Sequence, residues 1–125
     1  MGPSRILVIE DEEAIRTLLK RALESLYKVF LAADGQEGID KARIVEPHLI
    51  LLGLHMPGMD GHAVLAKLKA HARTSAIPVV IVSVAGEADM LMECQRAGAS
   101  DHLIKPFQIE DLHKVVLRQL SMRGD

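Results

Sequence analysis

The amino-acid sequence predicts an α/β domain in which helices cover both faces of a parallel sheet. Short apolar runs rich in β-branched residues alternate with longer segments whose apolar residues recur at helical spacing. Residues 49–52 and 78–82 are apolar throughout, which is typical of strands buried on both faces. Regular alternation of strands and helices favours parallel pairing with right-handed crossovers.

The first half of the chain contains two predicted strands and two predicted helices. Residues 6–9 predict a central strand, and residues 28–31 predict a weaker strand at a sheet edge. The helix between them is indicated by one stripe of apolar residues that we expect to be buried: Ile15, Leu18, Leu19, Ala22, Leu23 and Leu26. Asp34 and Glu37 have the spacing of a capping box at the start of the second helix. That helix ends before Pro47 and carries Ile39, Ala42 and Ile44.

The third strand is the apolar run over residues 49–52, and it ends in an abrupt turn. Pro57 fixes its own φ angle and Gly58 permits a positive one, so the chain can reverse there. Asp60 can then cap the next helix. The apolar residues of this helix are Ala63, Val64, Leu65 and Leu68.

The last part of the chain repeats the strand–helix alternation twice. Residues 78–83 predict the fourth strand, and residues 87–97 predict a helix that Gly98 can end. Residues 101–104 predict a short fifth strand. The final helix is indicated by a stripe of Ile109, Leu112, Val116 and Leu120.

These elements predict one domain of the flavodoxin-like, doubly wound class. Five strands and five helices within 125 residues suit the strand order 2-1-3-4-5. We expect residues 1–125 to form a single domain, with residues 1–4 as a leader and residues 122–125 as a tail. The sequence shows no internal repeat, low-complexity segment or linker.

Composition excludes several classes of function. A net charge of −2 gives no electrostatic footprint for direct binding of nucleic acid or an anionic membrane. No apolar run is long enough to span a membrane, and residues 6–9 are too short for a signal peptide. The single cysteine, Cys94, cannot form an internal disulfide and fits a reducing compartment. We therefore expect a cytoplasmic protein.

Polar side chains follow the predicted strands where each strand ends. Glu10 and Asp11 follow the first strand, Gly53 ends the third, Ser83 ends the fourth and Lys105 ends the fifth. In open parallel sheets, ligands bind beyond the carboxyl ends of the strands, near the point where the strand order reverses. Two carboxylates, a hydroxyl and an ammonium are therefore expected to share one site.

The segment Pro47–Gly61, together with its flanks, resembles the centre of a response-regulator receiver domain, and the resemblance covers nearly the whole chain. That family has an aspartate, the phosphoryl acceptor, where this chain has Gly53. Glycine has no side chain, so no acyl phosphate can form at position 53. Asp11 and Ser83 are poorly placed for in-line attack in its stead.

The resemblance implies a magnesium site and a phosphoryl-binding site. Glu10, Asp11 and the backbone carbonyl of His55 would hold Mg²⁺ together with the missing aspartate, so we expect Mg²⁺ binding to be weak or absent here. Ser83 and Lys105 would contact phosphoryl oxygens. Lacking its usual partner at position 53, Lys105 is expected to lean towards Glu10 or Asp11. The residue pair that begins at Lys105 matches the family's lysine-proline pair, which is usually cis.

The resemblance also implies a switch and an output surface. Ser83 and His102 occupy the switch positions; His102 stands where the family usually has Tyr or Phe. The fourth helix, fifth strand and fifth helix would form the face for an effector domain or a dimer partner. A sensor histidine kinase or a phosphotransfer protein would be the upstream partner. A transition-metal site is a weaker alternative at His55, because one histidine and two acids lack a compelling ligand spacing.

Three functions compete on this fold. The first is a receiver domain of a two-component or phosphorelay response regulator, its acceptor removed by engineering or natural divergence. The second is a pseudo-receiver, an interaction module that works without phosphorylation. An enzyme is disfavoured, because the acidic run at residues 10–13 would repel an FMN phosphate and a phosphatase of this fold class needs an aspartate nucleophile. Retention of Glu10, Asp11, Ser83 and Lys105 favours the first.

Overall fold

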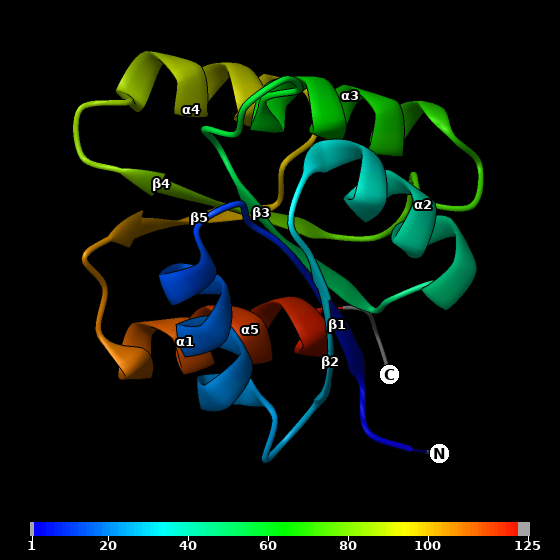
Figure 1. Ribbon diagram of the computed structural model, residues 1–125, viewed down its shortest axis with the longest axis vertical. Helices are drawn as coiled ribbons and strands as arrows, with labels where there is room; N and C mark the ends of the chain where they lie inside the picture. Colours follow the sequence, from blue (N-terminus) through cyan, green and yellow to red (C-terminus); the bar gives the residue numbers. More distant parts are fainter. Residues whose placement is uncertain (1, 123–125) are drawn as a thin grey trace.

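A computed structural model describes residues 2–122 and contains a five-stranded parallel sheet (Figure 1). The strand order is β2-β1-β3-β4-β5, as the sequence predicts. The strands are β1 (Arg5–Ile9), β2 (Lys28–Ala32), β3 (Leu49–Gly53), β4 (Val79–Val84) and β5 (Asp101–Lys105). Parts of the expected leader and tail, residue 1 and residues 123–125, lie outside the described residues.

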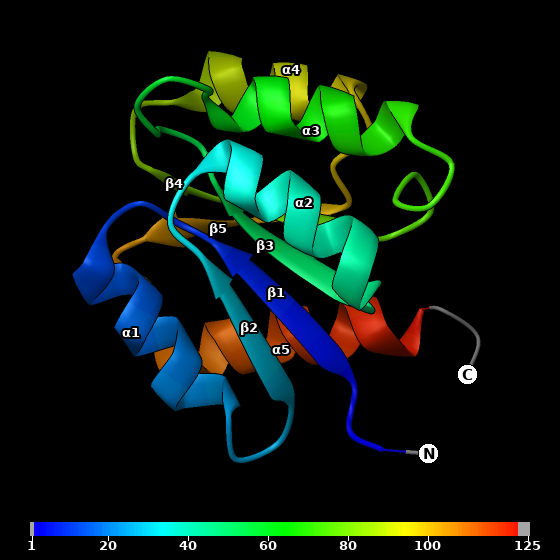
Figure 2. The same cartoon turned by 45° about the vertical axis from the view of Figure 1, so that its right-hand side comes forward.

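Five helices cover the two faces of this sheet. They are α1 (Glu13–Leu23), α2 (Gly35–Val45), α3 (Gly61–Ala70), α4 (Ala88–Arg96) and α5 (Ile109–Ser121). Helices α1 and α5 lie on one face, and α2, α3 and α4 lie on the other (Figure 2). Among the described residues, no helix is long and apolar enough to cross a membrane.

Strand pleating divides the core into two layers. Successive side chains of β1 point to opposite faces, so Leu7 and Ile9 pack beneath α2 and α3 while Ile6 and Val8 pack beneath α1 and α5. Every residue of β3 is buried, which explains its continuous apolar run. The sheet therefore holds the central strands rigidly and aligns their carboxyl ends.

Caps and glycines begin and end the helices much as predicted. The Asp60 carboxylate accepts a hydrogen bond from the backbone N–H of Ala63 at 2.9 Å, which caps α3. Asp34 likewise accepts from Glu37 N–H at 2.8 Å, but the Glu37 carboxylate binds the N–H of Ala33 instead of that of Asp34. Gly58, with φ 83°, adopts the left-handed conformation that the predicted turn requires.

The predicted buried stripes were too wide. Leu18 of α1 is 43% exposed and Ile44 of α2 is 82% exposed, whereas Leu19 and Leu23 are buried. Leu26 was placed in the first helix wrongly: α1 ends at Leu23, and Leu26 is 59% exposed in the turn that follows. Ile109 at the start of α5 is also exposed. A helix packed on a sheet buries only the arc that faces the strands, so apolar residues at the margins of a stripe remain in solvent.

Candidate functional site

Four of the predicted site residues line a small cavity at the carboxyl edge of the sheet: Glu10, His55, Ser83 and Lys105. The cavity has a volume of about 140 Å³, and Glu87 also lines it. Parallel register brings them together: Gly53 lies opposite Val82 in the β3–β4 pair, and Val84 lies opposite Lys105 in the β4–β5 pair. The ends of β1, β3, β4 and β5 therefore form one rim, as the sequence predicts.

Glu10 occupies the space left by the missing side chain at position 53. A Cβ atom built on Gly53 would lie 2.9 Å from Oε1 of Glu10 and 3.3 Å from its Cδ. Glu10 is only 2% exposed, and its Oε2 accepts a hydrogen bond from the Glu12 N–H at 3.1 Å. The carboxylate is thus inserted beneath the rim and does not project into solvent.

Lys105 makes the predicted contact with Glu10. Its Nζ lies 3.4 Å from Oε1 of Glu10 and 3.4 Å from Oε1 of Glu12. The predicted contact is confirmed for Glu10; in place of the alternative Asp11, the second partner is Glu12. The run of four consecutive acids at residues 10–13 could have signalled this additional partner. The peptide bond between Lys105 and Pro106 is cis, as the resemblance implied.

Burial dominates the electrostatics of Glu10. Desolvation raises the pKa of this carboxyl above its ordinary value, and a hydrogen bond with Asp11 adds to the rise. The Glu12 N–H and the Lys105 ammonium oppose the rise because both stabilise the ionised form. Lys105 is itself largely buried at its side chain, so this pair is screened by solvent less than a surface ion pair.

The imidazole of His55 lines the same cavity as Glu10 but contacts a different carboxylate. His55 is exposed, and its Nε2 contacts Oε2 of Glu87, a residue that the sequence did not single out. Oε1 of Glu87 accepts a hydrogen bond from the Val84 N–H at 2.8 Å. In residues 2–122, no group of three or more His, Cys, Asp or Glu is arranged to hold a metal ion. Glu10 is paired with Lys105, so its carboxylate would have to leave that ammonium to bind a metal ion.

The two predicted switch residues lie on neighbouring strands. Ser83 is buried and pairs in register with Ile104 of β5, two positions beyond the pairing of Ile81 with His102. Nδ1 of His102 is buried and has no hydrogen-bond partner among the residues that the structure describes. Their proximity fits the switch that the resemblance implies, and the role itself stays a prediction.

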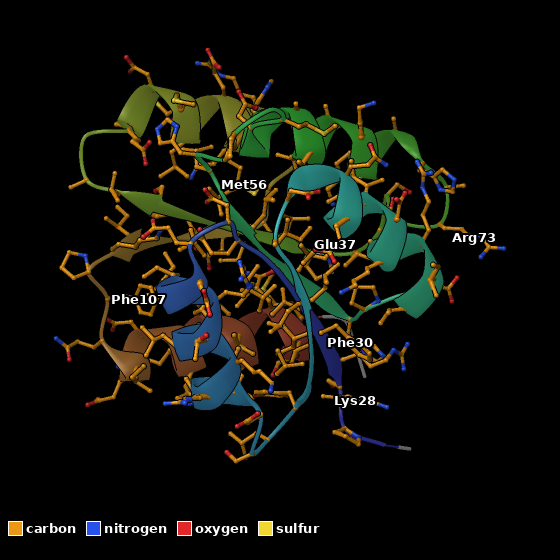
Figure 3. The ribbon with its side chains drawn as sticks, viewed as in Figure 1. Lys28, Phe30, Glu37, Met56, Arg73 and Phe107 are labelled. Atoms are coloured by element: carbon orange, nitrogen blue, oxygen red, sulfur yellow. The ribbon has the colours of Figure 1, made fainter. Side chains whose placement is uncertain are left out.

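An apolar groove that the sequence did not reveal adjoins the cavity. It has a volume of about 400 Å³ and is lined by Ile15, Leu18, Val84, Lys105, Pro106 and Phe107. Leu18 and Val84 are both exposed large apolar side chains, at 43% and 45%. Figure 3 shows Phe107 on the side of the molecule where the strands end, far from Arg73 at the opposite end. Ile15 and Leu18, two apolar residues of α1, thus form part of an apolar surface beside Lys105.

Comparison with known proteins identifies the family. The model of the response regulator receiver domain matches residues 6–117. The chain belongs to this family. Sporulation initiation phosphotransferase F of Bacillus subtilis is 34% identical to this receiver domain over 126 residues, which cover 100% of both chains.

Longer proteins and solved structures are also similar to this receiver domain. RpaA of Synechocystis, a DNA-binding dual master transcriptional regulator, is 38% identical over 122 residues, which cover 97% of this chain but 50% of that protein. The receiver domain of the sensor histidine kinase PA1611 from Pseudomonas aeruginosa superimposes with a TM-score of 0.88 at 26% identity. That match covers 96% of this chain and 99% of the other, whose crystal structure contains a magnesium ion in its active-site cleft.

Proposed function

We propose that this receiver domain retains a dormant phosphorylation site whose acceptor position, Gly53, is inactive. The observation that carries the proposal is the arrangement of Glu10 and Lys105 around Gly53, with Ser83 on the same cavity. Phosphoryl transfer needs an in-line nucleophile and a cation that stabilises charge on the transferred oxygens. The Lys105 ammonium and the Ser83 hydroxyl remain, whereas Gly53 has no side chain that could act as the nucleophile.

In this proposal the domain is a signalling module and not a turnover enzyme. Mg²⁺ binding is weak or absent, because the third carboxylate is missing and Lys105 supplies the positive charge next to Glu10. The buried Cys94 suits a cytoplasmic, reducing setting. The alternative is a pseudo-receiver that signals by binding alone, for which the internally neutralised Glu10–Lys105 pair would be the resting state.

We also propose a surface for each class of partner. A histidine kinase or phosphotransfer protein would dock on the apolar groove, because Lys105 lines both the groove and the site cavity. An effector domain or dimer partner would use α4, β5 and α5, where Met92 and Ile104 are exposed. Exposed apolar side chains beside polar neighbours are typical of such interfaces.

Restoring the acceptor tests the dormant-site proposal. Gly53→Asp should gain one phosphoryl group from a small acyl phosphate in the presence of Mg²⁺, measured by intact-mass spectrometry and located on Asp by peptide analysis. Gly53→Asn is the matched control, because it adds nearly the same volume without a nucleophilic carboxylate. If the aspartate variant is folded but is never labelled at position 53, the pseudo-receiver alternative replaces this proposal.

A further inference from the structure

The space for an acceptor at position 53 already contains a carboxylate. Oε1 of Glu10 lies 2.9 Å from the Cβ position of residue 53, so it stands within the space that an acceptor side chain at that position would fill. The same oxygen lies 3.4 Å from Nζ of Lys105. The Glu10 side chain, which extends from the end of β1, therefore places a carboxylate oxygen beside both position 53 and the Lys105 ammonium.

The surroundings of Glu10 hold this carboxylate in one orientation. Oε2 is bound by the Glu12 N–H at 3.1 Å, which leaves Oε1 to face Lys105. The backbone of Glu10 is also fixed, because its carbonyl accepts a hydrogen bond from Arg16 at 2.8 Å and its N–H donates to Ala32 at 3.0 Å. A preorganised nucleophile next to a fixed cation is the arrangement that phosphoryl transfer requires.

Access comes through the cavity that Glu10 shares with Ser83 and Lys105. A phosphoryl group entering it would meet the Lys105 ammonium, which can neutralise charge on the transferred oxygens. The carboxylates of Glu12 and Glu87 line the same cavity and oppose an anion, so the reaction should be slow.

We propose that Glu10 is a surrogate phosphoryl acceptor in this chain. This inference rests on the proposed function, since it assigns a new acceptor to the same site. Oε1 of Glu10 attacks the phosphorus of a small acyl phosphate, a new O–P bond forms, and the bond from phosphorus to the donor's acyl oxygen breaks. The donor leaves as its carboxylate with the bonding electron pair, no redox change occurs, and the product is a glutamyl phosphate.

The test uses the unmutated chain, so it does not depend on any variant folding. The chain is incubated with acetyl phosphate, treated with borohydride, and digested for peptide mass spectrometry. Borohydride reduces an acyl phosphate to the corresponding alcohol, so a glutamyl phosphate leaves a reduced side chain at Glu10. We expect one phosphoryl group in the intact mass and the reduced residue at Glu10.

Two variants sharpen the assignment. Glu10→Gln should lose the label, whereas Glu13→Gln should keep it, because Glu13 belongs to the same acidic run but is exposed and does not line the cavity. No label, or a label on Ser83, Asp11 or a histidine, overturns the inference. If Gly53→Asp is labelled at position 53 while the unmutated chain is not labelled at Glu10, the dormant-site proposal stands and the surrogate acceptor is refuted.

Discussion

Replacing Gly53 with aspartate should destabilise the metal-free protein and make its stability depend on Mg²⁺. The new Cβ would lie 2.9 Å from Oε1 of Glu10, so the Glu10 side chain must move away from its buried position. Gly53 is not among the glycines with positive φ, so the backbone itself accepts the substitution without strain. The conflict is therefore between two carboxylates.

The size of this loss of stability in Gly53→Asp follows from three effects, one unfavourable and two favourable. Two carboxylates about 4 Å apart repel by roughly 4 kcal/mol at an effective dielectric constant of about 20. Rotation of Glu10 into the cavity and the Lys105 ammonium should relieve about half of this repulsion. Loss of glycine freedom in the unfolded chain returns about 0.4–1 kcal/mol. We expect a net loss of about 1–2 kcal/mol, or roughly 4–10 °C in melting temperature.

Magnesium should reverse this loss in the variant only. A ligand that binds the folded state stabilises it by about 2.7 kcal/mol at a hundredfold excess over its dissociation constant. Thermal melts followed by circular dichroism, with chelator and with Mg²⁺, measure both effects. The control Gly53→Asn brings the same crowding without the charge, so it should lose less stability and respond little to Mg²⁺.

Two outcomes would refute this reasoning. A Gly53→Asp variant that is more stable than the parent chain in chelator would show that Glu10 does not occupy the acceptor's space. A melting temperature that is equally insensitive to Mg²⁺ in the variant and in the parent would show that the rim cannot assemble a magnesium site even with the third carboxylate present.

Two further predictions concern Glu10 and Gly61. Because burial raises the pKa of Glu10 above 4.5, the folded state binds more protons than the unfolded state just above pH 4.5, and this group's contribution to stability is lost as pH rises. Glu10→Gln should therefore gain stability relative to the parent chain between pH 4.5 and 7.5 in urea titrations; a constant difference would contradict the raised pKa. Gly61→Ala places a Cβ 2.5 Å from the Gly53 carbonyl oxygen, so β3 must shift. The free energy of unfolding should therefore fall by about 1–3 kcal/mol. An unchanged urea midpoint would show that this contact relaxes freely.

The local sequence determined most of the fold. A strand buried on both faces must be apolar at every position, so β3 and β4 were recognisable without any tertiary information. Caps such as Asp60 depend on contacts within four residues, and these also followed from spacing. The width of the buried face did not follow, because the burial of Leu18 depends on how α1 lies against the sheet.

The candidate site was also predicted in part from the sequence and decided in part by the tertiary structure. Which residues meet at the rim followed from parallel topology, since strand ends align whatever their side chains do. Where each side chain points was decided only in three dimensions. Glu10 turns beneath Gly53 because the absent side chain leaves space and Lys105 supplies a compensating charge. A sequence gives the order of residues along β1 and β3, but the space between two strands exists only after they pair.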